Sequence, residues 1–252
     1  MPPDPHPLEA LIEAIYASLH AEGVGLVGTA DLQTVAALLT AQSIETRGCP
    51  RAVSFAIPWP RDVVAKLREQ YRTEGDFRRC DYGAYEEAYW TSVERIDSLS
   101  AVVVGALVAA GHTAEPVRAR TPWSIRFPHK TAGHLAGLGW IGRNCMLVTP
   151  SYGPRVWLGT VLTDAMLPPT AHPSTDGIAV EPQCGECRVC VNRCPTGVFS
   201  GRTFRAADPP SERADFRPHW EADSPFRGTW DCGLCNILCP VGADSDQQTA
   251  EN

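Results

Sequence analysis

The chain has 252 residues, of which 44% are hydrophobic and 20% charged, and its formal net charge is −7. This length suits one large domain or two unequal ones, with a sizeable buried core. The negative net charge argues against a protein that binds nucleic-acid phosphates, because affinity for phosphates comes from clustered Lys and Arg. We therefore see no strong nucleic-acid signal.

Two features of the sequence bear on location. The longest apolar run, from Ala101 to Ala110, is about half the roughly 20 residues that a membrane-spanning helix needs. Residues 1–8 are rich in proline and lack a basic segment followed by an apolar one, so no secretory signal is predicted. We expect a cytoplasmic protein without membrane contact.

Helical and strand patterns alternate through the first two thirds of the chain. Apolar residues recur on one face of an expected helix over Leu8–His20, which Gly23 would end. Asp31 is expected to cap a second helix that runs to Ala41. Two more helices are expected over Tyr85–Ala110 and Lys130–Leu138, and strands over Val24–Val27, Val53–Ile57, Glu115–Ala119, Met146–Thr149 and Val156–Thr163. This alternation predicts a mixed α/β layer structure.

The segment from Leu167 to Pro182 holds four prolines and almost no apolar pattern, which is typical of a linker. We place a domain boundary there, with an α/β domain over residues 1–170 and a smaller domain over residues 171–252. The tail from Val241 to Asn252 is polar and is expected to be disordered.

Cysteines dominate the second part of the chain. Seven of the ten lie between Cys184 and Cys239, and structural disulfides are rare in the cytoplasm. The first run is Cys184-x2-Cys187-x2-Cys190-x3-Cys194-Pro195, and the second is Cys232-x2-Cys235-x3-Cys239-Pro240. The first run matches the bacterial two-cluster ferredoxin pattern, in which the fourth cysteine binds the other cluster. Zinc favours two separated pairs of ligands and fits this spacing poorly.

The pattern predicts two cubane 4Fe–4S clusters with crossed ligation. Cluster one is assigned to Cys184, Cys187, Cys190 and Cys239, and three corners of cluster two to Cys194, Cys232 and Cys235.

One ligand of the second cluster is not identified, because two such clusters need about eight thiolates and the runs supply seven. The open alternatives are a non-cysteine ligand, a 3Fe–4S cluster with an open site, or a distant cysteine. The candidates are Asp208, His219, Cys49, Cys80 and Cys145.

Residues 128–144 form a second informative stretch, whose glycines allow a backbone to approach a flat ligand or another segment closely. The order strand, G-x-G-x-x-G, helix is absent, and so is a Walker pattern. The string AGLGWIGRN (136–144), then MLVTPSYG (146–153), WLGTVLTD (157–164) and the first cysteine run resembles the epoxyqueuosine reductase family. The resemblance covers roughly residues 50–240 and keeps the family's order.

The resemblance implies a cobalamin-dependent reductase. Its α/β domain would have a nitroreductase-like scaffold that holds a corrinoid, and a ferredoxin-like domain with two clusters would supply electrons, a layout shared with reductive dehalogenases. The residues expected to line the corrinoid are Gly139, Trp140, Ile141, Gly142, Arg143, Asn144, Tyr152 and Gly153. The family's acidic catalytic residue is missing here, where Pro122-Trp123-Ser124 stands, and so is its extra cysteine after the first run.

Three residues are candidates for proton transfer to the substrate. Tyr82 carries a phenol, and His129 and Lys130 begin the helix beside the expected cofactor. We expect a reductase that acts on a small molecule, with electrons from an external ferredoxin or flavodoxin. The alternative is an electron-transfer or reductive-activator protein that serves a protein partner and has no corrinoid of its own. A third possibility is a pocket that takes a flavin or no cofactor.

Overall fold

The computed structural model describes residues 7–41, 43–76, 79–117, 127–171, 183–195, 199 and 233–242. Its contacts divide the chain into two compact units. The first unit comprises Met1–Ile57, Trp90–Leu138 and Trp157–Thr175, and the second comprises Pro58–Tyr89, Gly139–Val156 and Asp176–Asn252. Neither unit is one continuous segment, and the boundary near residue 170 stays a prediction.

A four-stranded sheet forms the centre of the first unit. Its strand order is β1 (Leu26–Asp31), β2 (Arg51–Pro58), β6 (Val156–Thr163) and β3 (Ala114–Pro116). The outer strands β1 and β3 run antiparallel to β2 and β6, respectively. The two central strands are almost entirely buried, and Gly159 leaves room for the ring of Phe55, which would lie 2.2 Å from a Cβ at that position.

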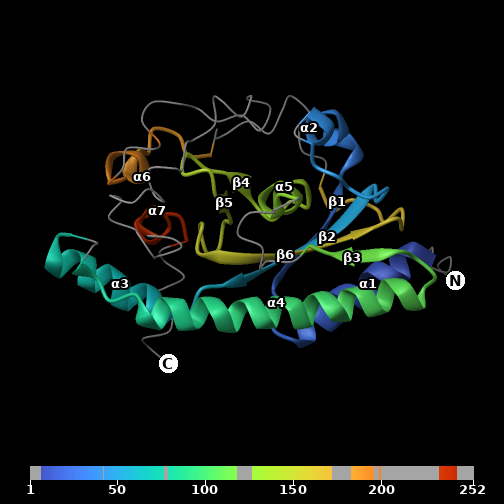
Figure 1. Cartoon of the computed structure of the whole chain (residues 1–252), viewed down its shortest axis with the longest axis horizontal. Coiled ribbons are helices and arrows are strands. Elements are labelled where there is room, and N and C mark those ends of the chain that lie inside the picture. The colour runs from blue at the N-terminus through green and yellow to red at the C-terminus, as the bar shows by residue number, and fades with distance from the viewer. Residues whose placement is uncertain are drawn as a thin grey trace, which may run out of the picture. The chain divides into compact units, whose positions relative to one another are not determined.

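Helices cover both faces of this sheet. Figure 1 shows α1 (Pro7–Ala21) and α4 (Gly83–Ala109) on one side and α5 (His129–Leu135) on the other. The α4 residues from Trp90 onward belong to the first unit, and their buried side chains recur every three or four positions, as a helix packed along one face requires. The short helices η1 (Gln33–Val35) and α2 (Ala36–Ala41) follow β1.

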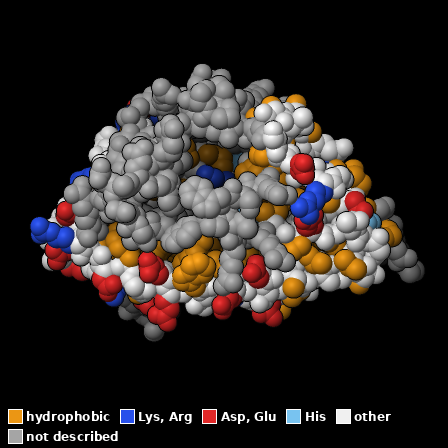
Figure 2. Space-filling view, in the orientation of Figure 1, with side chains coloured by type: hydrophobic (Ala, Val, Ile, Leu, Met, Phe, Trp, Pro, Cys, Tyr) orange, Lys and Arg blue, Asp and Glu red, His pale blue; other side chains and the backbone are white. Residues whose placement is uncertain are grey.

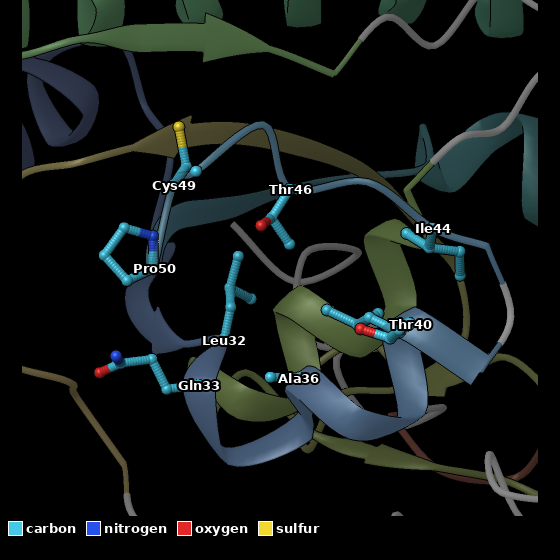
Figure 3. A pocket seen from close by; sticks show the side chains of 10 residues that line it. Leu32, Gln33, Ala36, Thr40, Ile44, Thr46, Cys49 and Pro50 are labelled. Carbon is cyan, nitrogen blue, oxygen red and sulfur yellow. The ribbon is translucent and has the colours of Figure 1, made fainter.

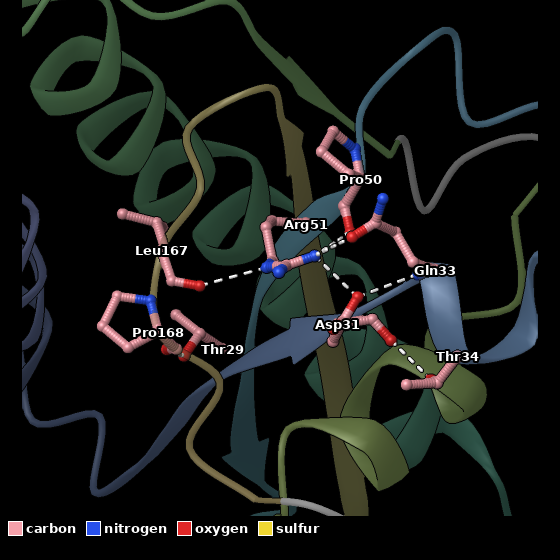
Figure 4. A network of polar contacts seen from close by, with 8 residues as sticks. All are labelled: Thr29, Asp31, Gln33, Thr34, Pro50, Arg51, Leu167 and Pro168. Carbon is pink, nitrogen blue, oxygen red and sulfur yellow. Dashed lines mark hydrogen bonds and ion pairs between the residues drawn. The ribbon is translucent and has the colours of Figure 1, made fainter. Parts of the chain in front are cut away.

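Hydrogen bonds from a buried arginine hold the segment after β6 against the sheet. The Arg51 side chain donates from Nη1 to Asp31 Oδ1 (2.6 Å) and from Nε to the Leu167 carbonyl (3.1 Å), as Figure 4 shows. Thr29 Oγ1 donates to the Pro168 carbonyl, and the Thr29 amide donates to Thr170 Oγ1. The first residues of the expected linker are therefore fixed, and residues 172–182 lie outside the described part of the chain.

The second unit is built from short elements. Helix α3 (Arg61–Glu74) buries Val63, Val64 and Leu67 and ends at Gly75, whose φ is 66°. The strands β4 (Trp140–Ile141) and β5 (Leu147–Val148) pair as an antiparallel hairpin. The cysteine runs contribute α6 (Val189–Asn192) and α7 (Leu234–Ile237).

The structure confirms the helices expected near residues 8–20 and 85–110 and the strand over Val156–Thr163. Several other boundaries were wrong. Helix α5 ends at Leu135 because Gly137 takes a left-handed φ of 75°. The strand expected over residues 115–119 is the shorter β3, which spans Ala114–Pro116. The strand expected over residues 24–27 starts later and runs further, as β1 over Leu26–Asp31.

Asp31 ends β1, and its carboxylate accepts a hydrogen bond from the Gln33 amide. The single helix expected after it is broken into η1 and α2. Helix α3 and strand β4 were missed. Within the described ranges, none of the helices combines the length and apolar character that a bilayer crossing requires.

Candidate metal centre

Four thiols from the two cysteine runs interact in the second unit. Burial raises the pKa of Cys190 to about 11, and the charges of Cys239, Cys184 and Cys187 raise it further. Burial also raises the pKa of Cys239, with Cys184 and Cys187 adding to the effect. Charges influence one another in this way only at short range. The structure thus places these four thiols within range of one another's charge. Their assignment to cluster one stays a prediction.

The spacing of these thiols bears on the kind of metal they suit. Among the described residues, no three Cys, His, Asp or Glu side chains are close enough together to hold a single metal ion. A cubane cluster places each thiolate on a different iron, so its ligands lie farther apart than those of one ion. The donor set is compatible with an iron–sulfur cluster, and a mononuclear zinc site receives no support.

Arginine side chains hold the backbone of both cysteine runs. Arg143 Nη2 donates to the carbonyl of Gly185, which lies between two cysteines of the first run (2.7 Å). The buried Arg155 donates from Nη1 to the carbonyls of Asn236 (3.3 Å) and Cys239 (3.1 Å) and from Nη2 to that of Val241 (2.9 Å). Arg68 Nε of α3 adds a bond to the Ile237 carbonyl (3.0 Å). These bonds fix the loop that carries Cys239.

Glycines allow the same segments to approach one another. A Cβ on Gly142 would lie 2.6 Å from Val148 Cγ2 and 3.7 Å from Cys184 Sγ. Gly153 has a φ of 59°, and a Cβ there would lie 2.2 Å from the Val241 carbonyl oxygen. The sequence assigned these residues, with Arg143 and Asn144, to a corrinoid. The structure places them against the cysteine segments, and their corrinoid role stays a prediction.

The other expected corrinoid residues lie in or near the hairpin. The Trp140 indole N–H is buried and finds no acceptor among the described residues. Ile141 packs against Phe199. The Tyr152 amide donates to Thr149 Oγ1. A Cβ on Gly139 would lie 2.1 Å from the Val148 carbonyl oxygen, so glycine is required for this hairpin to close.

A second group of cysteines surrounds Phe199. Cys145, Cys194 and Cys235 all pack against this buried ring, together with Ile141 and Val191. The other residues expected at cluster two, namely Cys232, Asp208 and His219, lie outside the described residues, as does the segment Pro122–Ser124.

The candidate proton donors fall in different units. His129 Nδ1 lies 2.9 Å from Thr160 Oγ1, and burial lowers the pKa of His129 to about 4, so the imidazole is neutral at neutral pH. Lys130 follows it in α5 and is half-buried. In the second unit, Tyr82 is half-buried and meets Tyr85 edge-on, with ring centroids 6.4 Å apart.

A pocket of about 220 Å³ lies beside η1 and α2 in the first unit (Figure 3). Leu32, Ala36 and Ile44 form apolar parts of its wall, and Cys49 lies at one side. None of the expected corrinoid residues lines it, and its volume is below the range typical of ligand pockets. This pocket is therefore not the expected corrinoid site.

The described structure thus defines a class: a mixed α/β chain with grouped cysteines suited to iron–sulfur clusters. No protein-family model matches the chain. It is 24% identical over 212 residues to an epoxyqueuosine reductase of Bacillus anthracis, covering 79% of this chain and 50% of that protein. It is 31% identical over 117 residues to the epoxyqueuosine reductase of Listeria monocytogenes, covering 44% of this chain and 28% of that protein. The family resemblance read from the sequence is confirmed, with the chain as a divergent relative.

Two solved structures have a fold similar to that of this chain. An epoxyqueuosine reductase with a modified tRNA stem loop matches 95% of this chain and 67% of its own, with a TM-score of 0.59 and 17% identity. A catabolic reductive dehalogenase in complex with 3-bromo-4-hydroxybenzoic acid matches 93% of this chain and 33% of its own, with a TM-score of 0.63 and 19% identity. The chain spans about half the length of the first of the curated relatives named above.

These relatives revise one expectation. From the net charge of −7 we expected no nucleic-acid partner. The structure of one related protein, however, contains a tRNA stem loop. The face drawn in Figure 2 does carry acidic side chains along α3 and α4. Acidity there does not exclude an RNA substrate, because a local basic site can bind one.

Proposed function

We propose that this chain is an iron–sulfur reductase that passes electrons from two clusters to a corrinoid, on which an organic substrate is reduced. The layout is a nitroreductase-like α/β domain with a ferredoxin-like cluster domain. The observation that carries the proposal is the grouping of Cys184, Cys187, Cys190 and Cys239. Two runs separated in sequence meet there, as crossed ferredoxin ligation requires.

The chain's own residues would bind and orient the reacting groups. A corrinoid supplies a low-potential cobalt centre for two-electron reduction. The buried Trp140 indole N–H needs an acceptor, which a bound group or an undescribed segment of the chain can supply. Gly139, Tyr152 and the other expected corrinoid residues are proposed to face that group.

Proton delivery is assigned among the three candidates. With a pKa near 4, His129 carries no proton to release as a cation at neutral pH. It is suited to holding a hydrogen bond through Nε2 while Nδ1 pairs with Thr160. Tyr82 and Lys130 are then the proposed proton sources, each carrying an ionisable proton at neutral pH.

The test is anaerobic purification from cells supplied with iron and cobalamin, followed by iron, sulfide and cobalt analysis and a visible spectrum. We expect about eight irons and about one cobalt per chain. Iron without cobalt, even after incubation with cobalamin, would replace the proposal with the electron-transfer function for a protein partner. The external donor is tested by adding reduced ferredoxin or flavodoxin and following bleaching of the cluster absorbance.

A second candidate function is the reduction of a modified nucleoside in tRNA. It is favoured by the related epoxyqueuosine reductase solved with a tRNA stem loop. A gel-shift titration with such a stem loop at two salt concentrations tests it. Salt-dependent binding would support this substrate class, and no binding at low salt would leave a small molecule as the substrate.

A further inference from the structure

A second group of cysteines shares one buried neighbour, Phe199. One member of this group, Cys145, is isolated in the sequence. Cys145 packs on the ring of Phe199, and so do Cys194 and Cys235. The two latter residues are the described ligands proposed for cluster two. Three thiols from three segments of the chain thus share one neighbour.

The turn that carries Cys145 is tightly fixed. The Gly142 amide donates to the Met146 carbonyl (2.9 Å), and the Cys145 amide donates to the Gly142 carbonyl (2.8 Å). Asn144 Oδ1 accepts a hydrogen bond from the Met146 amide (3.2 Å). These bonds close the β4–β5 hairpin and fix the backbone at Cys145.

Cys145 also has an unfavourable backbone conformation. Its φ is 59°, in the left-handed region that L-residues other than Asn and Asp seldom adopt. Glycine would occupy the same position without strain. A cysteine held there against this cost points to a use for its thiol, because such strain concentrates at functional sites.

Hydrogen bonds connect this turn to α7, which carries Cys235. Asn144 is buried, and its Nδ2 donates to Asn236 Oδ1 (3.3 Å). The same Asn236 oxygen accepts a bond from Cys235 Sγ (3.6 Å). The Asn236 side chain therefore lies against both the residue before Cys145 and the protonated thiol of Cys235.

The other cysteine candidates have different surroundings. Cys80 is half-buried, and its pKa is raised by burial first and then by the carboxylates of Glu74 and Asp76. Cys49 lies in the first unit, where it lines the small pocket of Figure 3. Neither residue is among those that pack on Phe199.

We propose that Cys145 is the eighth thiolate and binds the second cluster beside Cys194 and Cys235. Cys232, assigned to that cluster from the sequence, lies outside the described residues. This inference rests on the proposed two-cluster function. Binding would exchange the thiol proton for an iron–sulfur bond, with the proton released to solvent. The second cluster would then be a fully cysteine-ligated 4Fe–4S cluster, with no carboxylate or histidine ligand.

The experiment compares the whole chain with Cys145→Gly, which removes the thiol and suits the left-handed backbone, and with Cys80→Ala as the matched control. Each is reconstituted anaerobically with iron and sulfide. Iron, acid-labile sulfide and the electron paramagnetic resonance spectra as prepared and after dithionite reduction are measured. Circular dichroism of the cluster-free proteins checks that the fold is kept.

For the parent chain and Cys80→Ala, we expect about eight irons. For Cys145→Gly, we expect either about four irons or about seven with a new 3Fe–4S signal. A Cys145→Gly protein with the parent's iron and spectra overturns the inference and leaves the two-cluster function standing. The same loss in Cys80→Ala also overturns it. A parent chain that loads about four irons or fewer refutes the two-cluster function itself.

Discussion

Replacing Arg155 with methionine tests how the loop around Cys239 is held. The guanidinium is buried and donates to the carbonyls of Asn236, Cys239 and Val241 at 3.3, 3.1 and 2.9 Å. Methionine keeps much of the apolar stem but supplies no donor. The variant therefore removes hydrogen bonds from a backbone segment that has few other ways to satisfy its acceptors.

The size of the effect follows from these bonds. A hydrogen bond to a charged group contributes about 1.5–3 kcal/mol. The two shorter bonds then amount to about 3–6 kcal/mol, with little added by the bond of 3.3 Å. Burial raises the pKa of Cys239 and the charge of Arg155 opposes this rise, so the loss of Arg155 further disfavours the thiolate that a cluster needs.

Two assays measure this. Urea unfolding of the cluster-free chain gives the free energy of unfolding, and the rate of iron loss to a chelator reports on the loaded chain. Arg51→Met is the control, because Arg51 is also buried but lies in the first unit. It should lower the free energy of unfolding without speeding iron loss. If Arg155→Met changes the free energy of unfolding by less than about 1 kcal/mol and iron loss not at all, the Arg155 hydrogen bonds do not hold the Cys239 loop.

Three further substitutions test a titratable side chain, a crowded glycine and an open glycine. Because the pKa of His129 is lowered from 6.5 to about 4, the unfolded chain binds more protons between these values, and stability falls as pH drops through this window. The fall is at most about 3 kcal/mol and is expected nearer 1–2 kcal/mol for a partly solvated ring. The His129→Gln variant should show a shallower dependence in urea titrations from pH 7 to 4, and equal slopes would contradict the assignment. Gly139→Ala should cost about 2 kcal/mol, since its Cβ would lie 2.1 Å from the rigid Val148 carbonyl oxygen. Gly105→Ala, in α4 with nothing within 4 Å of the new Cβ, should gain about 0.5–1 kcal/mol. The opposite order of these two stabilities would show that the crowding at Gly139 is relieved by movement.

Local patterns explain what the sequence could predict. The apolar spacing of α4 and the buried strand β6 were recognised because their periodicity is strong. The grouping of the cysteine runs followed from ligand spacing. Helix α3 was missed because it buries only Val63, Val64 and Leu67 within a largely polar stretch.

Contacts between distant segments could not be predicted. Nothing local marks Arg155 as a donor to carbonyls beyond residue 235, since an arginine after a proline turn is usually solvated. Cys145 looked like an isolated thiol, and only the packing around Phe199 places it with Cys194 and Cys235. The positive φ of Cys145 also has no signal in the sequence, where glycine or asparagine would have been expected.

The discontinuity of the second unit has a consequence for biosynthesis. Its segments are Pro58–Tyr89, Gly139–Val156 and Asp176–Asn252, so the loops that carry the cysteines meet residues made much earlier. On the ribosome, the hairpin of Gly139–Val156 must wait for the stretch around Cys235 and Cys239 before Arg155 finds its carbonyls. On the proposed function, iron delivery would therefore follow synthesis of all three segments. A fragment cut near residue 170 would carry the cysteine runs without the arginines that hold them.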